Sequence, residues 1–108
     1  MNNALRSIGE LDRVIHEPSR LLLAAVLYPL EEADFLYLLT ESQMTKGNLS
    51  THLTRLEEAG YVQIEKGFRG KIPHTLVRLT REGRAAFERY RAELKKITST
   101  LDGRQSRR

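Results

Sequence analysis

Cysteine is absent from the 108 residues, and long apolar runs are scarce. Without cysteine the chain can form neither a disulfide nor a thiolate metal site, which is compatible with an intracellular location. The longest unbroken apolar run, residues 21–28, is too short to cross a bilayer. The opening residues, MNNALRSIGELDR, have no apolar segment typical of a signal peptide. We therefore expect a cytoplasmic protein with no membrane partner.

The common signatures of catalysis and cofactor binding are also missing. The sequence has no cysteine nucleophile, no G-x-S-x-G motif and no phosphate-binding glycine motif after a strand. His16, His52 and His74 are not spaced as metal ligands. We expect no enzyme, no cofactor and no bound metal.

Acidic residues are scarce in the second half of the chain. Residues 1–60 hold 5 Lys or Arg against 9 Asp or Glu, whereas residues 61–108 hold 13 against 5. The halves therefore carry net charges of −4 and +8, which add up to the overall +4. This asymmetry suggests a polyanionic partner bound mainly by the second half, with a solvated basic surface as the alternative.

The spacing of apolar residues predicts a series of helices. Pro18 fits the first turn of one helix, Thr45 is a good N-cap, and Gly60 suits a left-handed helix end. The second helix is apolar nearly all round and should form the buried centre of the fold. The expected helices span residues 4–15, 18–28, 35–42, 46–59 and 81–101, with a turn at 41–44.

After Gly60 the apolar period changes from 3.6 to 2, which predicts strands. The segment YVQIEK, residues 61–66, forms the first expected strand and residues 74–79 the second. The segment between them, GFRGKIP, is rich in glycine and is expected to be a loop. Residues 102–108 are polar and basic and are expected to be a disordered tail.

This order of elements predicts a mainly α, α+β fold: a winged helix-turn-helix with a two-stranded β-wing and long terminal helices that form a dimer. One domain is expected to cover residues 1–101. It contains a recognition helix at 45–59, the wing at 61–79 and a C-terminal dimerisation helix at 81–101.

The helix after Thr45 has the surface that a recognition helix needs. Such a helix buries one apolar seam and turns its other side chains to the major groove. Leu49, Leu53 and Leu56 form the seam, and polar or basic groups surround it. The alternative is an ordinary amphipathic surface helix. The candidate DNA-binding residues on this helix and the wing are Thr45, Lys46, Gly47, Asn48, Ser50, Thr51, Arg55, Lys66, Arg69 and Lys71.

Different candidates are expected to make different contacts. Asn48 can pair bidentately with adenine, and Arg55 with guanine or a phosphate. The wing residues would bind phosphates or the adjacent minor groove and so position the protein without reading sequence. Alternatively, their charges only prevent pairing at the edge of the hairpin. His52 lies near the leucine seam and is expected to pack rather than read bases.

The last helix carries a heptad pattern. It could pack on its own domain, or a second copy could cover it, with the first helix contributing. We favour the homodimer, which would present two recognition helices to a palindromic operator. The expected interface residues are Leu5, Ile8, Phe87, Tyr90, Leu94, Ile97 and Leu101.

Three segments together carry a family resemblance: HEPSRLLLAAVL, TKGNLSTHLTRLEEAGYV and KGFRGKIPHTLVRLTREGRAAF. Over roughly residues 11–94 the chain resembles the small one-domain winged helix-turn-helix transcriptional regulators related to the MarR and ArsR types. The resemblance implies a homodimeric regulator of double-stranded DNA, usually a repressor, with a dimer formed by the terminal helices.

Some features depart from that family. The turn ESQM lacks the glycine often found there, and no cluster typical of the metal-sensing branch is present. Compared with full MarR-type proteins the chain is short, so we expect no elaborate drug-binding cleft between long helices. A small-molecule effector, if one exists, is of unknown chemistry. A winged-helix module that binds protein, without sequence-specific DNA readout, is the alternative function.

Overall fold

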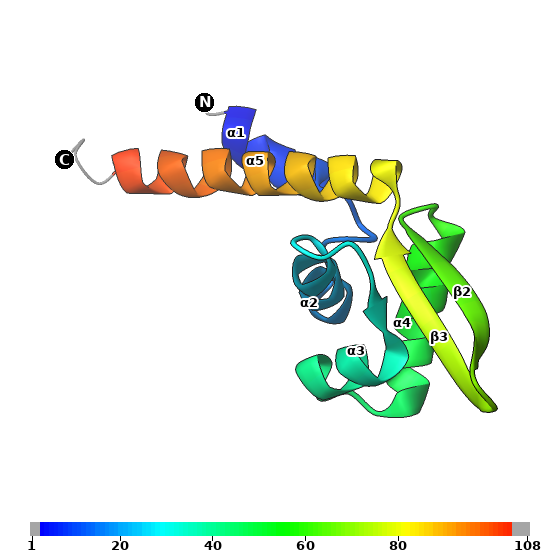
Figure 1. Cartoon of the computed structure of the whole chain (residues 1–108). Helices are drawn as coiled ribbons and strands as arrows, with labels where there is room; N and C mark the ends of the chain where they lie inside the picture. Colours follow the sequence, from blue (N-terminus) through cyan, green and yellow to red (C-terminus); the bar gives the residue numbers. More distant parts are fainter. Residues whose placement is uncertain (1–2, 105–108) are drawn as a thin grey trace.

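The computed structural model describes residues 3–104 (Figure 1). Its elements follow the order expected for a winged helix, which confirms the predicted fold class. The elements are α1 (Asn3–Arg6), the 3-10 helix η1 (Ser7–Glu10), α2 (Pro18–Leu27), β1 (Ala33–Asp34), α3 (Phe35–Ser42), α4 (Lys46–Glu58), β2 (Val62–Arg69), β3 (Ile72–Leu79) and α5 (Arg81–Arg104).

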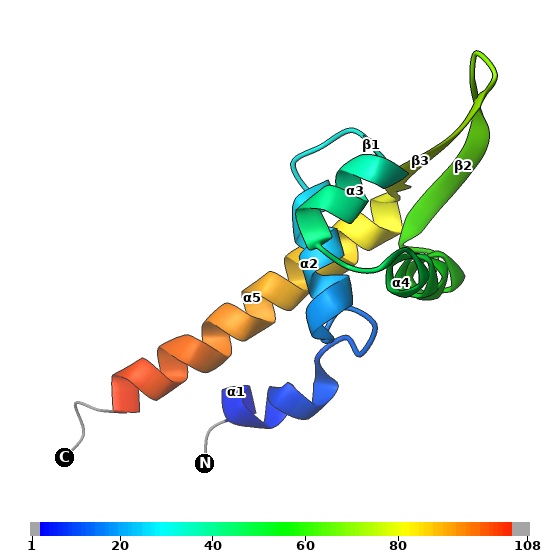
Figure 2. The same ribbon diagram turned by 90° about the horizontal axis from the view of Figure 1, so that it is seen from below.

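The molecule is elongated, with extents of 65 × 24 × 22 Å. Helices α2, α3 and α4 and the sheet form the body, while α5 runs across one end and extends beyond it (Figures 1 and 2). The tip of the β2–β3 hairpin and the start of α4 lie at the end of the body away from α5 (Figure 1). The two ends of the molecule are therefore available for different contacts.

The main core lies between these helices and the sheet. Leu23 and Leu27 of α2 are fully buried, as expected for the central helix. The leucine seam of α4 closes one side of this core, and Val77 of β3 closes another. The buried members of this cluster are Leu23, Leu27, Ala33, Leu38, Leu49, Leu53, Leu56, Val62, Val77 and Leu79.

Side-chain oxygens cap the N-terminal ends of α4 and α5. Thr45 Oγ1 accepts a hydrogen bond from the Asn48 N–H (3.1 Å). Thr80 Oγ1 accepts one from the Gly83 N–H (2.9 Å). Gly60, which follows α4, has φ +81°, a conformation that glycine adopts without steric penalty. The predicted caps and the predicted helix-ending glycine are confirmed.

The continuous helix predicted for residues 4–15 is wrong. The chain forms only α1 and η1 there and then turns toward α2. Asp12 Oδ1 accepts from the backbone N–H groups of Val14 (2.9 Å) and Ile15 (3.1 Å). A short acidic side chain thus takes the place of helical carbonyl acceptors. Leu11 and Ile15 are buried, but they reach the core from a turn.

The predicted loop between the strands is also wrong in extent. Strands β2 and β3 pair from Val62↔Leu79 to Arg69↔Ile72, so only Gly70 and Lys71 connect them. The sheet includes a short strand that the sequence analysis missed, and its order is β1-β3-β2. Pairing of β1 with β3 stops at Asp34↔Leu76, so Pro73 lies beyond β1 and its missing N–H breaks no bond to β1.

The predicted disordered tail is wrong for residues 102–104, which continue α5. Residues 105–108 lie outside the described residues. With 24 residues, α5 is about 36 Å long at 1.5 Å per residue. None of the helices in residues 3–104 is both long enough and apolar enough to cross a membrane.

Candidate nucleic-acid interface

One side of α4 is buried and the other is open to solvent. Leu49, Leu53 and Leu56 are at most 2% exposed. Apart from the capping hydrogen bond that Thr45 accepts, Arg55 makes the one side-chain contact found among the α4 candidates of the described residues, with its Nε 4.0 Å from Glu58 Oε1. The helix therefore presents polar groups that its own chain does not cover. The exposed candidates at the start of α4 and along it are Thr45, Lys46, Gly47, Asn48, Ser50, Thr51 and Arg55.

The turn between α3 and α4 holds the two helices at an angle. Gln43 ends α3 with φ +58°, the left-handed conformation that glycine most readily adopts. Its N–H donates to the Leu39 carbonyl (3.0 Å), which satisfies the helix end. The missing glycine in ESQM is therefore replaced by a residue that adopts the same backbone conformation.

A cluster at the start of α2 fixes the position of α4. Arg20 is only 9% exposed, and its Nε donates to the Val14 carbonyl (2.7 Å). Its Nη1 donates to His52 Nδ1 on α4 (3.2 Å). Glu17 caps α2 by accepting from the Arg20 N–H (2.7 Å). His52 is half-buried, so its predicted packing role is confirmed.

Arg78 ties the base of the hairpin to the loop before β1. Its Nη2 lies 3.1 Å from Glu32 Oε1 and 3.2 Å from Glu65 Oε1. These hydrogen bonds, with that to Glu32 the larger contribution, raise the pKa of Arg78 above its usual value. Arg78 thereby offsets one of these two negative charges at the base of the hairpin, away from the cations nearer its tip.

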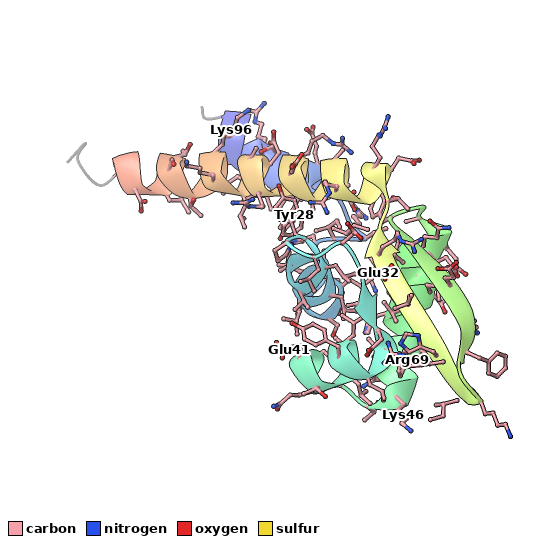
Figure 3. All side chains as sticks on the ribbon, viewed as in Figure 1. Tyr28, Glu32, Glu41, Lys46, Arg69 and Lys96 are labelled. Carbon is pink, nitrogen blue, oxygen red and sulfur yellow. The ribbon has the colours of Figure 1, made fainter. Side chains whose placement is uncertain are left out.

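The three predicted hairpin cations are all exposed. Lys66 and Lys71 form no ion pair within residues 3–104, whereas Arg69 Nη2 donates to His74 Nε2 (3.3 Å). Figure 3 places Lys46 and Arg69 toward the same end of the molecule, away from Lys96 on α5. The structure thus brings the start of α4 and the hairpin tip to one end of the chain.

Contacts at the opposite end of the body hold α5 against α2 and against the chain that leaves α4. Tyr61 lies between α4 and β2, and its hydroxyl donates to Asp12 Oδ2. Burial first, and then this hydrogen bond, raise the pKa of Tyr61 to about 12. Tyr28 donates to Glu88 Oε2 (2.6 Å), and Arg84 Nη1 donates to the Tyr28 carbonyl (2.9 Å). These contacts fix the direction in which α5 leaves the body.

The predicted interface residues divide into two groups. The side chains of Phe87, Tyr90 and Ile97 are at most 6% exposed, because they pack on α2 and on the segment that leads to it. The chain thus already covers these three, so they offer little surface to a partner. Ile8, Leu94 and Leu101 are exposed to 49%, 37% and 51%, and Leu5 is half-buried.

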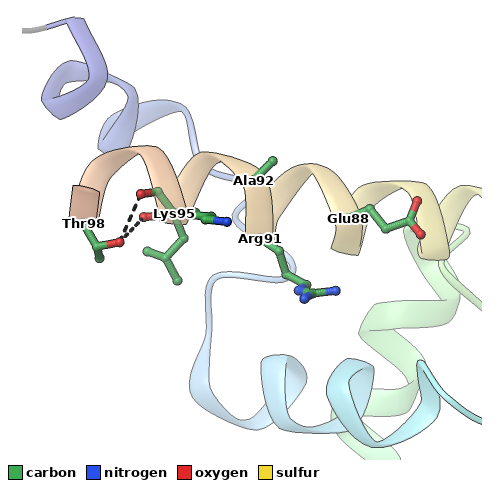
Figure 4. A pocket seen from close by; sticks show the side chains of 6 residues that line it. Glu88, Arg91, Ala92, Lys95 and Thr98 are labelled. Atoms are coloured by element: carbon green, nitrogen blue, oxygen red, sulfur yellow. Dashed lines mark hydrogen bonds between the residues drawn. The ribbon is translucent and has the colours of Figure 1, made fainter. Parts of the chain in front are cut away.

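An open groove follows the exposed side of α5 (Figure 4). Its volume is about 560 Å³, and all its lining residues belong to that one helix. Thr98 Oγ1 lies 3.1 Å from the carbonyls of both Leu94 and Lys95. A groove lined by a single helix has no opposite wall within the described chain. The lining residues are Glu88, Arg91, Ala92, Leu94, Lys95 and Thr98.

Some residues that support the interface from behind were not predicted from the sequence. They are Glu17, which caps α2, Asp12, which pairs with Tyr61, and Arg78, which links the loop before β1 to the hairpin. Only Glu17 left a local signal, since an acidic residue directly precedes the Pro18 that opens α2. The other two pairings join residues far apart in the sequence.

Comparison with known proteins agrees with this architecture. Residues 19–98 match the family described as winged helix DNA-binding domain. The chain is 33% identical over 91 residues to the uncharacterized protein MJ0432 of Methanocaldococcus jannaschii. This match covers 83% of this chain and 98% of the relative. It is 29% identical to a solved transcriptional regulator homologue from Pyrococcus horikoshii OT3, with a TM-score of 0.85 over 94% of this chain and 99% of that one.

A MarR-family protein from Enterococcus faecalis V583 shares the fold at 22% identity, with a TM-score of 0.73 over 95% of this chain and 92% of that one. The family match covers the helix-turn-helix, the hairpin and most of α5. The chain therefore belongs to the winged helix DNA-binding domain family and is a small winged-helix DNA-binding regulator.

Proposed function

We propose that this protein is a sequence-specific regulator of transcription that binds a palindromic operator in double-stranded DNA as a homodimer and acts as a repressor. The observation that carries the proposal is the polar, uncovered side of α4 above its buried leucine seam. A cationic hairpin at the same end of the molecule adds to it (Figure 3).

Helix α4 would enter the major groove with its first turns. Asn48 and Arg55 can form the bidentate contacts that distinguish adenine and guanine. The uncapped N–H groups and the dipole at the start of α4 attract a phosphate. Lys66, Arg69 and Lys71 would bind the backbone beside that groove and fix the register of the protein.

The terminal helices would form the dimer. Helix α5 extends beyond the body, and α1 packs against it (Figures 1 and 2). Exposed Leu94, Leu101 and Ile8 would be buried by a second copy, which would also supply the missing wall of the groove in Figure 4. An effector of unknown chemistry would then have a site between the copies.

A protein-binding role for α4 has less support. The exposed large hydrophobic side chains in residues 3–104 all lie outside α4. Protein interfaces are enriched in aromatic residues and depleted in charge at their centre. The open side of α4 has the opposite composition, which favours a nucleic-acid partner.

Selection of bound fragments from a random duplex library tests the proposal. The expected result is an enriched inverted repeat with half-sites about one DNA turn apart. The Asn48→Ala variant serves as the control and should lose the preference at one position in each half-site. Recovery of no enriched sequence by the unaltered protein would refute sequence-specific binding.

A further inference from the structure

The tip of the hairpin combines exposed apolar side chains with cations. Phe68 is 74% exposed and Ile72 is 70% exposed, the highest values among the exposed large hydrophobic residues of the described chain. A single exposed apolar residue is common on protein surfaces. Two of them on either side of one tight turn, both bordered by positive charge, form a local surface whose composition suggests a partner.

The pairing of the strands places these side chains on opposite faces of the hairpin. Phe68 is paired with Pro73, and Arg69 is paired with Ile72. Paired residues share a face, and neighbours along a strand alternate. One face of the tip therefore carries Phe68 with Pro73, and the other carries Ile72 with the stem of Arg69.

The turn makes this tip narrow. Gly70 has φ +63°, and Lys71 is not in the positive-φ region. A two-residue connection with glycine first is a type II′ turn, which continues the twist of the strands without widening them. The tip projects away from the helices in the view of Figure 2. It is thus thin and reachable from both faces.

We propose that the hairpin tip, residues 68–72, acts as an apolar wedge that enters the DNA minor groove and bends the duplex. Phe68 and Ile72 would contact sugars and partly separate a base step, while Lys66 and Lys71 bind the flanking phosphates. Minor-groove proteins use Phe, Ile and Pro in this way and bend DNA by roughly 20–90°. The inference rests on the proposed function, because it assumes that α4 occupies the adjacent major groove.

Charge decides which occupant the tip fits best. Three cations lie within six residues, and no acidic residue lies between Lys66 and Pro73. A second hairpin tip of the same chain would bring like charges together. A DNA minor groove supplies both the negative charge and a slot about 6 Å wide.

A wedge also implies sequence preference at a position without base-edge hydrogen bonds. Pyrimidine–purine steps such as TA and CA/TG separate and bend more easily than other steps. The selected operators should therefore contain such a step at a fixed distance outside each half-site. The proposed base contacts of α4 do not predict this enrichment.

The test measures affinity, salt dependence and DNA bending for four proteins on one selected duplex, and affinity also on a matched duplex whose flanking pyrimidine–purine step is replaced. Phe68→Ala should weaken binding roughly tenfold, in line with the loss of an aromatic contact to a base. Its slope of log affinity against log salt should be unchanged, because no cation is lost. Energy transfer between dyes at the duplex ends should show a smaller bend, and the flanking-step preference should disappear.

Two comparison variants complete the experiment. Lys71→Ala should reduce the magnitude of the salt slope by about 0.9, the value for one phosphate contact, and leave most of the bend. Leu22→Ala alters an exposed leucine on α2 and should change neither quantity. Unaltered affinity and bending in Phe68→Ala would overturn the wedge while leaving the proposed function intact. Failure of the unaltered protein to bind any duplex in a salt-dependent way would instead refute the proposed function.

Discussion

Arg20 Nη1 donates a hydrogen bond to His52 Nδ1 over 3.2 Å and so joins the start of α2 to the middle of α4. A guanidinium has no acceptor, so a neutral His52 in this contact carries its proton on Nε2. Arg20 also satisfies the Val14 carbonyl. One largely buried side chain thus sets the position of the proposed recognition helix against the body.

Replacing Arg20 with methionine should destabilise the protein. Arg20→Met keeps an apolar stem but leaves the Val14 carbonyl and His52 without their donor. We expect the free energy of unfolding to fall by about 1–3 kcal/mol. Urea denaturation followed by circular dichroism measures the change. Arg55→Met, at an exposed position on α4, is the control and should change stability by less than about 0.5 kcal/mol; equal effects would contradict the bracing role of Arg20.

Gly83 should tolerate no side chain. A Cβ atom at this position would lie 2.0 Å from the Tyr61 carbonyl oxygen, which is backbone and has no rotamer to change. Gly83→Ala should therefore cost about 1–3 kcal/mol or more, as expected for overpacking. Gly47→Ala meets no atom within 4 Å and should instead stabilise α4 by up to about 1 kcal/mol. Thermal denaturation of both variants distinguishes close approach from a general effect of replacing glycine.

Tyr61 should make stability fall at alkaline pH. Its pKa is raised from 10.0 to about 12 in the folded chain. The folded state therefore holds a proton that the unfolded state loses, so the contribution is complete below pH 10 and is lost as the pH rises toward 12. Tyr61→Phe should flatten this part of the stability curve, measured by urea denaturation between pH 9 and 12. An identical slope in both proteins would contradict the shifted pKa.

The exposed end of α5 should control self-association. Leu94→Glu combined with Leu101→Glu places charge where a second copy is proposed to bury apolar surface, so the variant should be monomeric. Leu36→Glu changes a 68% exposed leucine on α3 and is the matched control. Light scattering at micromolar concentration should show a dimer for the unaltered protein and for this control. A monomer for the unaltered protein would refute the homodimer.

Base reading and positioning should separate by mutation. Arg55→Ala should cost roughly 1–3 kcal/mol on the operator and relax specificity at one base position. Lys66→Ala should weaken the operator and random DNA about equally, because a phosphate contact carries no sequence information. Competition binding with both duplexes measures the two effects. If Arg55→Ala lowered both affinities alike, α4 would not read bases through that residue.

The fold could be predicted from the sequence largely because its signals are local. The heptad-like seam of Leu49, Leu53 and Leu56, the cap at Thr45 and the left-handed Gly60 each depend on neighbouring residues. The change in the spacing of apolar residues after Gly60 predicts the hairpin, but it does not predict how long the two strands are. Gly67 looked like a loop residue, yet it is paired with His74, and pairing depends on the other strand.

Some of the errors depend on contacts between residues distant in the sequence. The second half of the helix expected at residues 4–15 is replaced by a turn. In this turn Asp12 accepts a hydrogen bond from Tyr61, which follows the C-terminal end of α4. The seam of α5 was correctly recognised as apolar, but periodicity alone does not say what covers it. Phe87 and Ile97 are covered by their own chain, whereas Leu101 is not.

The salt dependence of duplex binding tests the central claim most directly. The affinity of the unaltered protein and of the Lys66→Ala/Lys71→Ala double variant is measured on one duplex across a range of salt concentrations. The account predicts a steep linear fall of log affinity with log salt, and a slope smaller in magnitude by about 0.9 for each lysine contact removed. A flat profile, or equal slopes for the two proteins, would contradict it.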